Sequence, residues 1–158
     1  PPLMGGILKT AREKGFEGPI YNLSPTSPEV VRMIASPQLA TDCIVPAPDL
    51  TSPNVPDAMK AQVQTVLAKY DQVSWDYLRP FDSLWVMAQA IEAAGSIDTT
   101  AVAKTWETMK SYKALEGDGT MGGLQTYGVN HQGVQPFAIT KIMGDTMELV
   151  KWVTPSIP

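Results

Sequence analysis

The stretch Gly18–Val45, GPIYNLSPTSPEVVRMIASPQLATDCIV, decides the fold. Two short apolar runs, Pro19–Leu23 and Thr41–Val45, predict strands. Between them Ser27 and Pro28 predict the start of a helix, because a serine hydroxyl can accept from free backbone N–H groups and proline fits the first helical position. A strand, a short helical crossover and a second strand predict two parallel strands in a covered sheet.

The helix within this stretch has one apolar face and a clear end. Its apolar residues are Val30, Val31, Ile34 and Ala35, and Pro37 is predicted to stop it. Ligands of parallel sheets gather beyond the carboxyl ends of the strands. The loop 24–27, after the first strand, is therefore the first candidate for a binding site.

Composition bounds the class of protein. The chain has 158 residues, of which 44% are hydrophobic and 18% charged, enough for one folded domain with a core. The net charge of −4 and the scattered Lys and Arg argue against binding to nucleic acid. No apolar run approaches the ~20 residues that span a bilayer. Since the chain opens on Pro1-Pro2 rather than Met, we expect a processed chain or a fragment.

Hydrophobic periodicity predicts further elements on both sides of this unit. Helices are predicted at Met4–Lys14, Asp57–Tyr70 and Phe81–Ala94, and a fourth is predicted to follow the cap residue Asp98. Strands are predicted at LQTY (124–127), QPFAITKIM (135–143) and TMELVKWV (146–153), with turns at Asn130–Gly133 and Gly144-Asp145.

Two segments admit more than one interpretation. The helix Phe81–Ala94 is apolar nearly all round, so we expect it to be buried in an assembly larger than this chain supplies. The proline-rich run VPAPDLTSPNVP, which ends at Pro56, is either a stiff surface loop or a passage between two lobes. The residues alone favour the surface loop.

No set of residues predicts catalysis, a metal site or a cofactor. His131 is the only histidine and is expected in a solvated turn, and Cys43 is the only cysteine and is expected in the core. The loop Gly117–Gly123 lacks the features of a phosphate cradle. In the predicted linker SWDYLRP, the aromatic residues Trp75 and Tyr77 are expected to pack on a ligand or to fill an interdomain gap.

The order of these elements resembles the C-terminal part of type I periplasmic solute-binding proteins of ABC importers, the branched-chain amino acid and amide group. The resemblance is carried by ILKTAREKGFEGPIY, SPEVVRMIASPQLATDCIV, RPFDSLWVMAQAIEAAGSIDTTAVAKTWETM and GTMGGLQTYGVNHQGVQPFAITKIMGDTMELV. It spans nearly the whole chain. It implies an α/β, Rossmann-like, two-lobed fold, of which this chain would supply the C-terminal portion: a parallel sheet, a helical segment and a final β-hairpin.

The resemblance also implies a division into lobes. Residues 1–45 would belong to the second lobe, 46–56 and 111–118 would be hinge crossings, 57–110 would be helices of the first lobe, and 119–158 would close the second lobe. The proline-rich run then becomes a hinge crossing rather than a surface loop. The N-terminal half, with the first-lobe sheet and its ligand loops, would be missing from this chain.

A small-molecule solute and the membrane permease of an ABC transporter are the partners that the resemblance implies, in the periplasm or outside the cell, with a lipid anchor as one possibility. The candidate ligand-binding residues are Leu23, Ser24, Pro25, Thr26 and Tyr77. Amino-acid binders of the family typically carry an acidic residue where this chain has Ser24. A hydroxyl cannot offer the charge-assisted bond that an ammonium group requires, so we expect a neutral, carboxylate-bearing or aromatic solute. A ligand-sensing receptor of the same fold is the alternative function.

Overall fold

The structure is a computed structural model that describes residues 2–23 and 27–157. The chain divides into two compact units, which are described separately. Unit 1 comprises Pro1–Tyr77 and Phe137–Val153, and unit 2 comprises Leu78–Pro136 and Thr154–Pro158. These units are groups of residues in contact within this chain, so they do not test the lobe boundaries predicted for a longer protein.

Unit 1 is built on the predicted strand–helix–strand stretch. β1 (Ile20–Tyr21) pairs in parallel with β2 (Cys43–Val45), which confirms the parallel arrangement. β2 also pairs antiparallel with β5 (Phe137–Met143), and β5 pairs with β6 (Thr146–Val153), so the four-stranded sheet has the order β1-β2-β5-β6. The predicted turn at Gly144-Asp145 is confirmed, with Gly144 at φ +66°.

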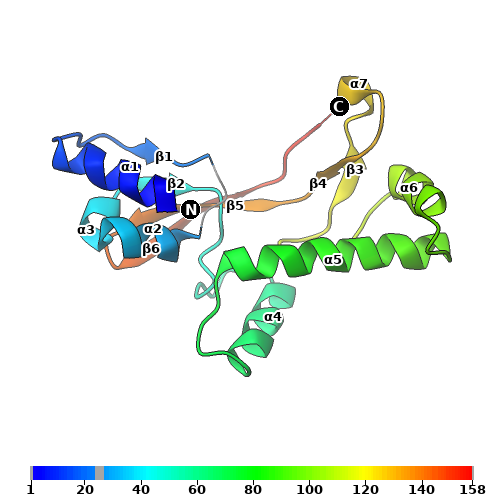
Figure 1. The fold of residues 1–158 in the computed structure, drawn as a ribbon, viewed down its shortest axis with the longest axis horizontal. Coiled ribbons are helices and arrows are strands. Elements are labelled where there is room, and N and C mark those ends of the chain that lie inside the picture. The colour runs from blue at the N-terminus through cyan, green and yellow to red at the C-terminus, as the bar shows by residue number, and fades with distance from the viewer. Residues whose placement is uncertain (1, 24–26, 158) are drawn as a thin grey trace. The chain divides into compact units, whose positions relative to one another are not determined.

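Three helices of unit 1 pack on one another, and the last of them also contacts β5 (Figure 1). They are α1 (Pro2–Glu13), α2 (Pro28–Ala35) and α3 (Pro37–Ala40), and unit 1 also contains α4 (Asp57–Leu67). α1 confirms the helix predicted from Met4, and Gly15 follows it at φ +87° as expected of a helix end. The side chains of Leu8, Val31, Ala35, Ala40, Cys43 and Ile142 are among those that form the buried core.

One prediction about the crossover is wrong, and one element was not predicted. Ser27 precedes α2, but its hydroxyl donates to the Glu29 carboxylate instead of accepting from the first turn, whose N–H groups of Val30 and Val31 donate to the Ser27 carbonyl. The helix ends before Pro37 as predicted, at Ala35, but Ser36 then turns the chain at φ +73° and Pro37 begins the unpredicted helix α3. Proline suits this position because the first N–H groups of a helix have no partner within it.

The proline-rich segment 46–56 contains neither helix nor strand, as predicted. It is not a solvated surface loop, however, because Ala47, Pro48, Leu50 and Val55 are buried. Apolar side chains between the prolines therefore anchor the segment, and its course is fixed by packing rather than by backbone pairing.

Unit 2 contains most of α5 (Trp75–Ala94), together with α6 (Thr99–Thr108), β3 (Thr120–Gly122), α7 (Leu124–Tyr127) and β4 (Gln132–Val134). β3 and β4 pair antiparallel in a two-stranded sheet. Asp98 caps α6 as predicted, with its carboxylate accepting from the Ala101 N–H at 2.9 Å.

Three predicted features of this region are wrong. The segment SWDYLRP is not a linker, because α5 already begins at Trp75 and runs through Pro80; the buried side chains of Trp75 and Leu78, three residues apart, stabilise this extra turn. LQTY forms the helix α7 rather than a strand, since Gly123 and Gly128 close it at both ends with φ of +100° and +78°. The residues 130–133 are accordingly not a hairpin turn, and Gln132 and Gly133 lie in β4.

Candidate functional site

The loop after β1 is the predicted binding site, and the structure describes both of its margins. Asn22 is buried and its backbone N–H donates to the Ile44 carbonyl at 2.8 Å, which extends the parallel pairing by one residue. Leu23 is 89% exposed, and Ser27 on the far margin is buried. Ser24, Pro25 and Thr26 lie outside the described residues. Two buried residues, Asn22 and Ser27, thus flank the predicted loop at the carboxyl end of β1.

Tyr77, the remaining predicted ligand residue, lies in the first turn of α5. Its backbone N–H donates to the Ser74 carbonyl at 3.1 Å, and its side chain is 57% exposed. Trp75, its neighbour in the same turn, is buried. Of the two aromatic residues singled out from the sequence, Trp75 is thus a core residue, while the ring of Tyr77 remains accessible.

The structure does not join the predicted residues into one site. In the part of the chain that it describes, no hydrogen bond or ring contact connects Leu23 with Tyr77. Both are exposed apolar or aromatic side chains of unit 1. What they share is the ability to cover an apolar or aromatic part of a ligand.

Two ionisable groups of unit 1 lie next to the strand that leads to this loop. Cys43 is buried in the core as predicted. Burial raises the pKa of its thiol to about 11, which makes it a poor nucleophile. Asp42 Oδ1 accepts from Lys141 Nζ at 2.6 Å, and this bond lowers the pKa of Asp42 and raises that of Lys141. The pair links the turn before β2 to β5.

An apolar hollow lies in unit 2 between α5 and α6. Its volume is about 470 Å³, and it is lined by Met87, Ile91, Ile97, Thr99, Val102, Ala103, Trp106 and His131. His131 Nε2 lies 2.8 Å from Glu107 Oε1, so the histidine has a partner as well as solvent. No pattern in the sequence indicates this pair, because the two residues are 24 positions apart.

A second hollow, of about 500 Å³, lies in unit 1 between α2 and the turn that joins β5 to β6. It is lined by Glu29, Arg32, Met33, Ser36, Pro37 and Asp145. Arg32 bridges the two elements by donating to the Asp145 carbonyl at 2.5 Å. The lining combines both signs of charge with an exposed methionine, and it holds no convergent set of catalytic groups.

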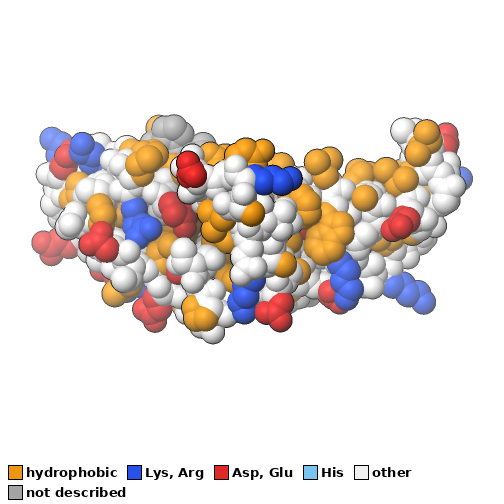
Figure 2. Space-filling view, turned by 90° about the horizontal axis from the view of Figure 1, so that it is seen from below, with side chains coloured by type: hydrophobic (Ala, Val, Ile, Leu, Met, Phe, Trp, Pro, Cys, Tyr) orange, Lys and Arg blue, Asp and Glu red, His pale blue; other side chains and the backbone are white. Residues whose placement is uncertain are grey.

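Neither metal chemistry nor a membrane span finds support in the described ranges. Within residues 2–23 and 27–157, no three His, Cys, Asp or Glu side chains group as metal ligands do, and no helix has the length and apolar character to cross a bilayer. Figure 2 shows acidic and basic side chains interspersed on the face it presents, without a basic stripe.

Comparison with known proteins identifies the fold. A family model described as "Periplasmic binding protein" matches residues 2–146. Comparison with curated protein sequences found no match. Among solved structures, the branched-chain amino acid binding protein LivJ of Streptococcus pneumoniae, in complex with isoleucine, superposes with a TM-score of 0.77 at 19% identity. The leucine-binding protein LivK of Thermotoga maritima gives 0.76 at 19% identity, and each alignment covers 98% of this chain and 42% of the other.

A solute-binding protein of an ABC transporter from R. palustris, in complex with benzoate, also has this fold, with a TM-score of 0.68 at 15% identity, covering 98% of this chain and 41% of the other. The chain thus spans less than half the length of these proteins. The fold predicted from the sequence, the C-terminal portion of a type I periplasmic binding protein, is confirmed. The family model covers most of the chain, and the chain belongs to the periplasmic binding protein family.

Proposed function

We propose that this chain is the C-terminal part of the solute-binding component of an ABC importer. It would hold a small solute in the cleft between the two lobes of the complete protein and deliver it to a membrane permease. The observation that carries the proposal is the family match over residues 2–146, together with a loop at the carboxyl end of β1 that leaves a parallel strand as ligand loops do. The protein would act by binding and lobe closure, without chemical change of the solute.

The location follows from the family. Periplasmic binding proteins work outside the cytoplasm, so we place this protein in the periplasm or at the outer surface of the cell membrane, where a lipid anchor would keep it near its permease. In the same frame, residues 1–45 and 119–158 would belong to the second lobe, 57–110 to the first, and 46–56 and 111–118 to the hinge.

The solute class follows from the residues of the candidate loop. Ser24 and Thr26 offer hydroxyl groups, and the loop has no carboxylate that could pair with an ammonium group. Hydroxyl groups can donate to a carboxylate. The exposed side chains of Leu23 and Tyr77 would cover an apolar or aromatic body. An aromatic or otherwise apolar carboxylate therefore fits better than a branched-chain amino acid, and the fold accommodates benzoate in one neighbour.

The apolar hollow between α5 and α6 offers a competing place for a ligand. Its lining is nearly all apolar side chains of two helices, with few groups to orient a polar solute. We assign it instead to the packing of first-lobe helices on a sheet that this chain does not contain. The solute site is then at the loop after β1.

The test is a thermal-shift screen of the full-length gene product that contains these residues, unfolded and refolded to remove bound solute. Benzoate and related aromatic carboxylates are expected to raise the melting temperature more than leucine, isoleucine or valine. Leucine or valine as the tightest ligand would refute the solute class. If no solute raised the melting temperature, even in a screen widened to sugars and amides, the proposed function would be refuted.

Variants locate the site in the same assay. Leu23→Ala and Tyr77→Ala are expected to weaken binding about tenfold, the scale of one lost apolar contact at a site. Leu3→Ala and Tyr70→Ala remove equally exposed side chains elsewhere on unit 1 and are expected to bind as the wild type does. Ser24→Asp is expected to shift preference toward α-amino acids, because it supplies a partner for the ammonium group.

A further inference from the structure

Asp82 is a buried carboxylate that the proposed binding site does not use. It lies on α5 within unit 2 and is only 6% exposed. Its Oδ1 accepts from the backbone N–H of Leu115 at 2.7 Å, and its Oδ2 accepts from Gln135 Nε2 at 3.2 Å. A buried charge is costly unless its oxygens are hydrogen-bonded. These two bonds are the reason why the carboxylate can remain in this position.

A chain of hydrogen bonds orients the Gln135 amide that binds Asp82. The backbone N–H of Val134 donates to the Tyr112 hydroxyl, and that hydroxyl donates to Gln135 Oε1 at 3.2 Å. The amide of Gln135 is thereby oriented with its nitrogen toward Asp82. A carboxylate can accept at both oxygens, whereas an asparagine would place a second N–H donor against Gln135. These bonds therefore favour the charged form of residue 82.

The two residues that Asp82 binds come from two different connecting segments. Leu115 lies between α6 and β3, and Gln135 lies just before Pro136, after which the chain passes from unit 2 into unit 1. These segments touch one another, since a Cβ on Gly117 would lie 3.1 Å from Pro136 Cγ. Gly117 also has a φ of +130°, which a side chain would strain. Asp82 thus hydrogen-bonds two connecting segments close to the place where they contact each other.

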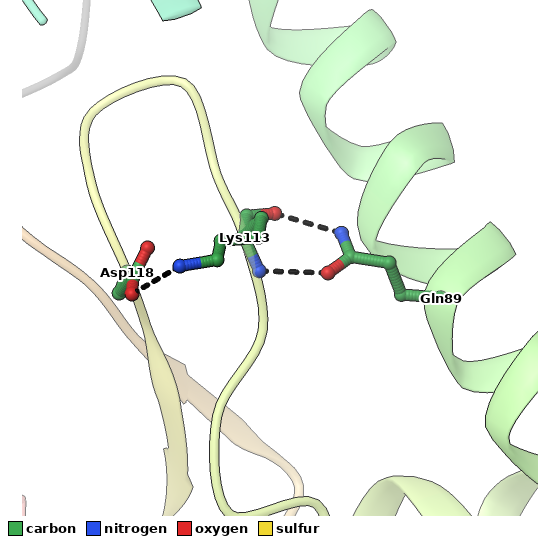
Figure 3. Close-up of polar contacts among 3 residues, drawn as sticks. All are labelled: Gln89, Lys113 and Asp118. Atoms are coloured by element: carbon green, nitrogen blue, oxygen red, sulfur yellow. Dashed lines mark hydrogen bonds and ion pairs between the residues drawn. The ribbon is translucent and has the colours of Figure 1, made fainter.

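α5 holds the first of these segments at a second point. Gln89, two turns after Asp82, donates from Nε2 to the Lys113 carbonyl at 2.8 Å and accepts from the Lys113 N–H at 2.7 Å (Figure 3). Lys113 Nζ in turn lies 2.6 Å from Asp118 Oδ2. Side chains of α5 thus bond the backbone of two residues, Lys113 through Gln89 and Leu115 through Asp82. The attachment of this segment is therefore polar and specific in register.

We propose that Asp82 is a positioning residue that clamps both connecting segments to α5, so that changes in lobe arrangement take place in the residues beyond the clamp. Residues 112–119 and 132–135 would move with α5, because Tyr112 and Gly119 are joined by two backbone hydrogen bonds of 2.9 Å and all of these residues lie in unit 2. The Pro136–Phe137 link would absorb the bending, so the second lobe would begin after residue 136 rather than at 119. This assignment rests on the proposed function in one respect, because lobe closure is the motion that the clamp would direct. The exchange measurement below needs no solute.

The clamp is expected to respond to pH. Burial raises the pKa of Asp82, against the opposing effects of the bonds from Leu115 and Gln135 and of the charge on Arg79. The other titratable group in the network is Tyr112, while Lys113, Glu116 and Asp118 lie on the same connecting segment. A carboxylate with a raised pKa takes up its proton at a higher pH than an ordinary aspartate. Acidification is thus expected to release the clamp before most other carboxylates are protonated.

The test is amide hydrogen exchange on the full-length gene product without added solute, comparing wild type, Asp82→Asn and Glu92→Gln. Glu92 is an exposed carboxylate on the same helix and is the matched control. Asp82→Asn is expected to lower protection about tenfold in both 112–116 and 132–135, the scale of one lost bond to a charged group. β5 and β6 are expected to stay unchanged, and Glu92→Gln is expected to match wild type.

A pH series separates positioning from general stability. Wild-type protection in both segments is expected to fall on acidification, and Asp82→Asn is expected to lack this step. If Asp82→Asn fails to fold, Gln135→Met takes its place. This variant removes the second hydrogen bond while keeping the length of the side chain, and it is expected to lower protection in 132–135. The proposal would be overturned if Asp82→Asn left exchange unchanged or lowered protection in one segment only. It would also be overturned if protection fell equally in β5 and β6. Failure of every solute to bind would refute the proposed function and leave the exchange result standing.

Discussion

Gly5 of α1 lies so close to Ile34 of α2 that a methyl group on Gly5 would stand 2.5 Å from the Ile34 Cβ. The absence of a side chain lets the two helices approach each other directly. Gly6, the next residue, has no atom within 4 Å of the place where its Cβ would be. Two adjacent glycines of one helix thus have opposite roles.

The first prediction uses this pair. Gly5→Ala is expected to destabilise the protein by roughly 1–3 kcal/mol, the usual cost of overpacking a tight contact. Gly6→Ala is expected to stabilise it by about 0.5–1 kcal/mol, because alanine favours the helix. Urea denaturation of both variants measures the two free energies of unfolding. Equal effects of the same sign would show that α1 does not pack on α2 in this way.

The second prediction concerns Arg12, which ties the end of α1 to the crossover. Its guanidinium donates to the carbonyls of Phe16 and Gly18, each at 2.7 Å, and to that of Thr41 at 2.8 Å. Lysine has its three donors on a single nitrogen and cannot span the separate carbonyls that the two terminal nitrogens of the guanidinium bond. Arg12→Lys is therefore expected to lower the free energy of unfolding by about 2 kcal/mol, the scale of one charged hydrogen bond.

Lys9 supplies the control for Arg12, since it lies on the same helix and forms only an exposed ion pair with Glu13 at 3.9 Å. Lys9→Met is expected to change stability by less than about 0.5 kcal/mol. Thermal unfolding followed by circular dichroism distinguishes the two variants. An Arg12→Lys protein as stable as Lys9→Met would contradict the role given to the guanidinium.

Local patterns were sufficient to predict the parallel pair and the hairpin of unit 1, but not the antiparallel pairing of β2 with β5 that joins them into one sheet. The parallel pair follows from two apolar runs around a helix, and the hairpin follows from alternation in β5, where Ala138, Thr140 and Ile142 are buried. The periodicity of two places these side chains on one face whatever the rest of the chain does. The same holds for α6, because its cap Asp98 lies three residues from the N–H group that it binds.

Features that depend on distant residues could not be predicted in this way. Asp82 appears in the sequence as one acidic residue on a mostly apolar helix, while its partners lie 33 and 53 positions away. α7 has only four residues, too few for periodicity to separate helix from strand, and the positive φ angles of its flanking glycines decide its form. The early start of α5 likewise depends on burial of Trp75, which the linker-like composition around it conceals.

The third prediction is that Cys43 is inert in the native state. The thiol is buried and its pKa is raised to about 11, so the reactive thiolate is scarce and inaccessible at pH 8. Reaction with an aromatic disulfide reagent, followed by mass spectrometry of the peptide that contains Cys43, reports this residue. The rate is expected to be negligible without denaturant and to rise in parallel with unfolding in urea. Rapid labelling of the native protein would show that β2 is exposed to solvent.

The fourth prediction concerns the ion pair of Asp42 and Lys141, whose Oδ1 and Nζ atoms lie 2.6 Å apart. The hydrogen bond and charge of Lys141 hold the pKa of Asp42 below its ordinary value of 3.8. A carboxyl group with a lowered pKa stabilises the folded state above its unfolded pKa, and this contribution is lost as the pH falls through the folded value. Asp42→Asn is expected to be less stable than wild type at pH 7, with the difference shrinking below pH 3.8.

Asparagine is the informative replacement because residue 42 has a φ of +64°, a conformation that asparagine also adopts readily. The variant therefore removes the charge and spares the turn. Lys141 is expected to affect stability at the alkaline end of the pH range. Its pKa lies above the ordinary value of 10.5, so its contribution to the free energy of unfolding is present below that pH and is lost as the pH rises further. Urea denaturation of wild type, Asp42→Asn and Lys141→Met across the pH range measures both effects. If the Asp42→Asn difference stayed constant down to pH 2, the charge on Asp42 would not be its source.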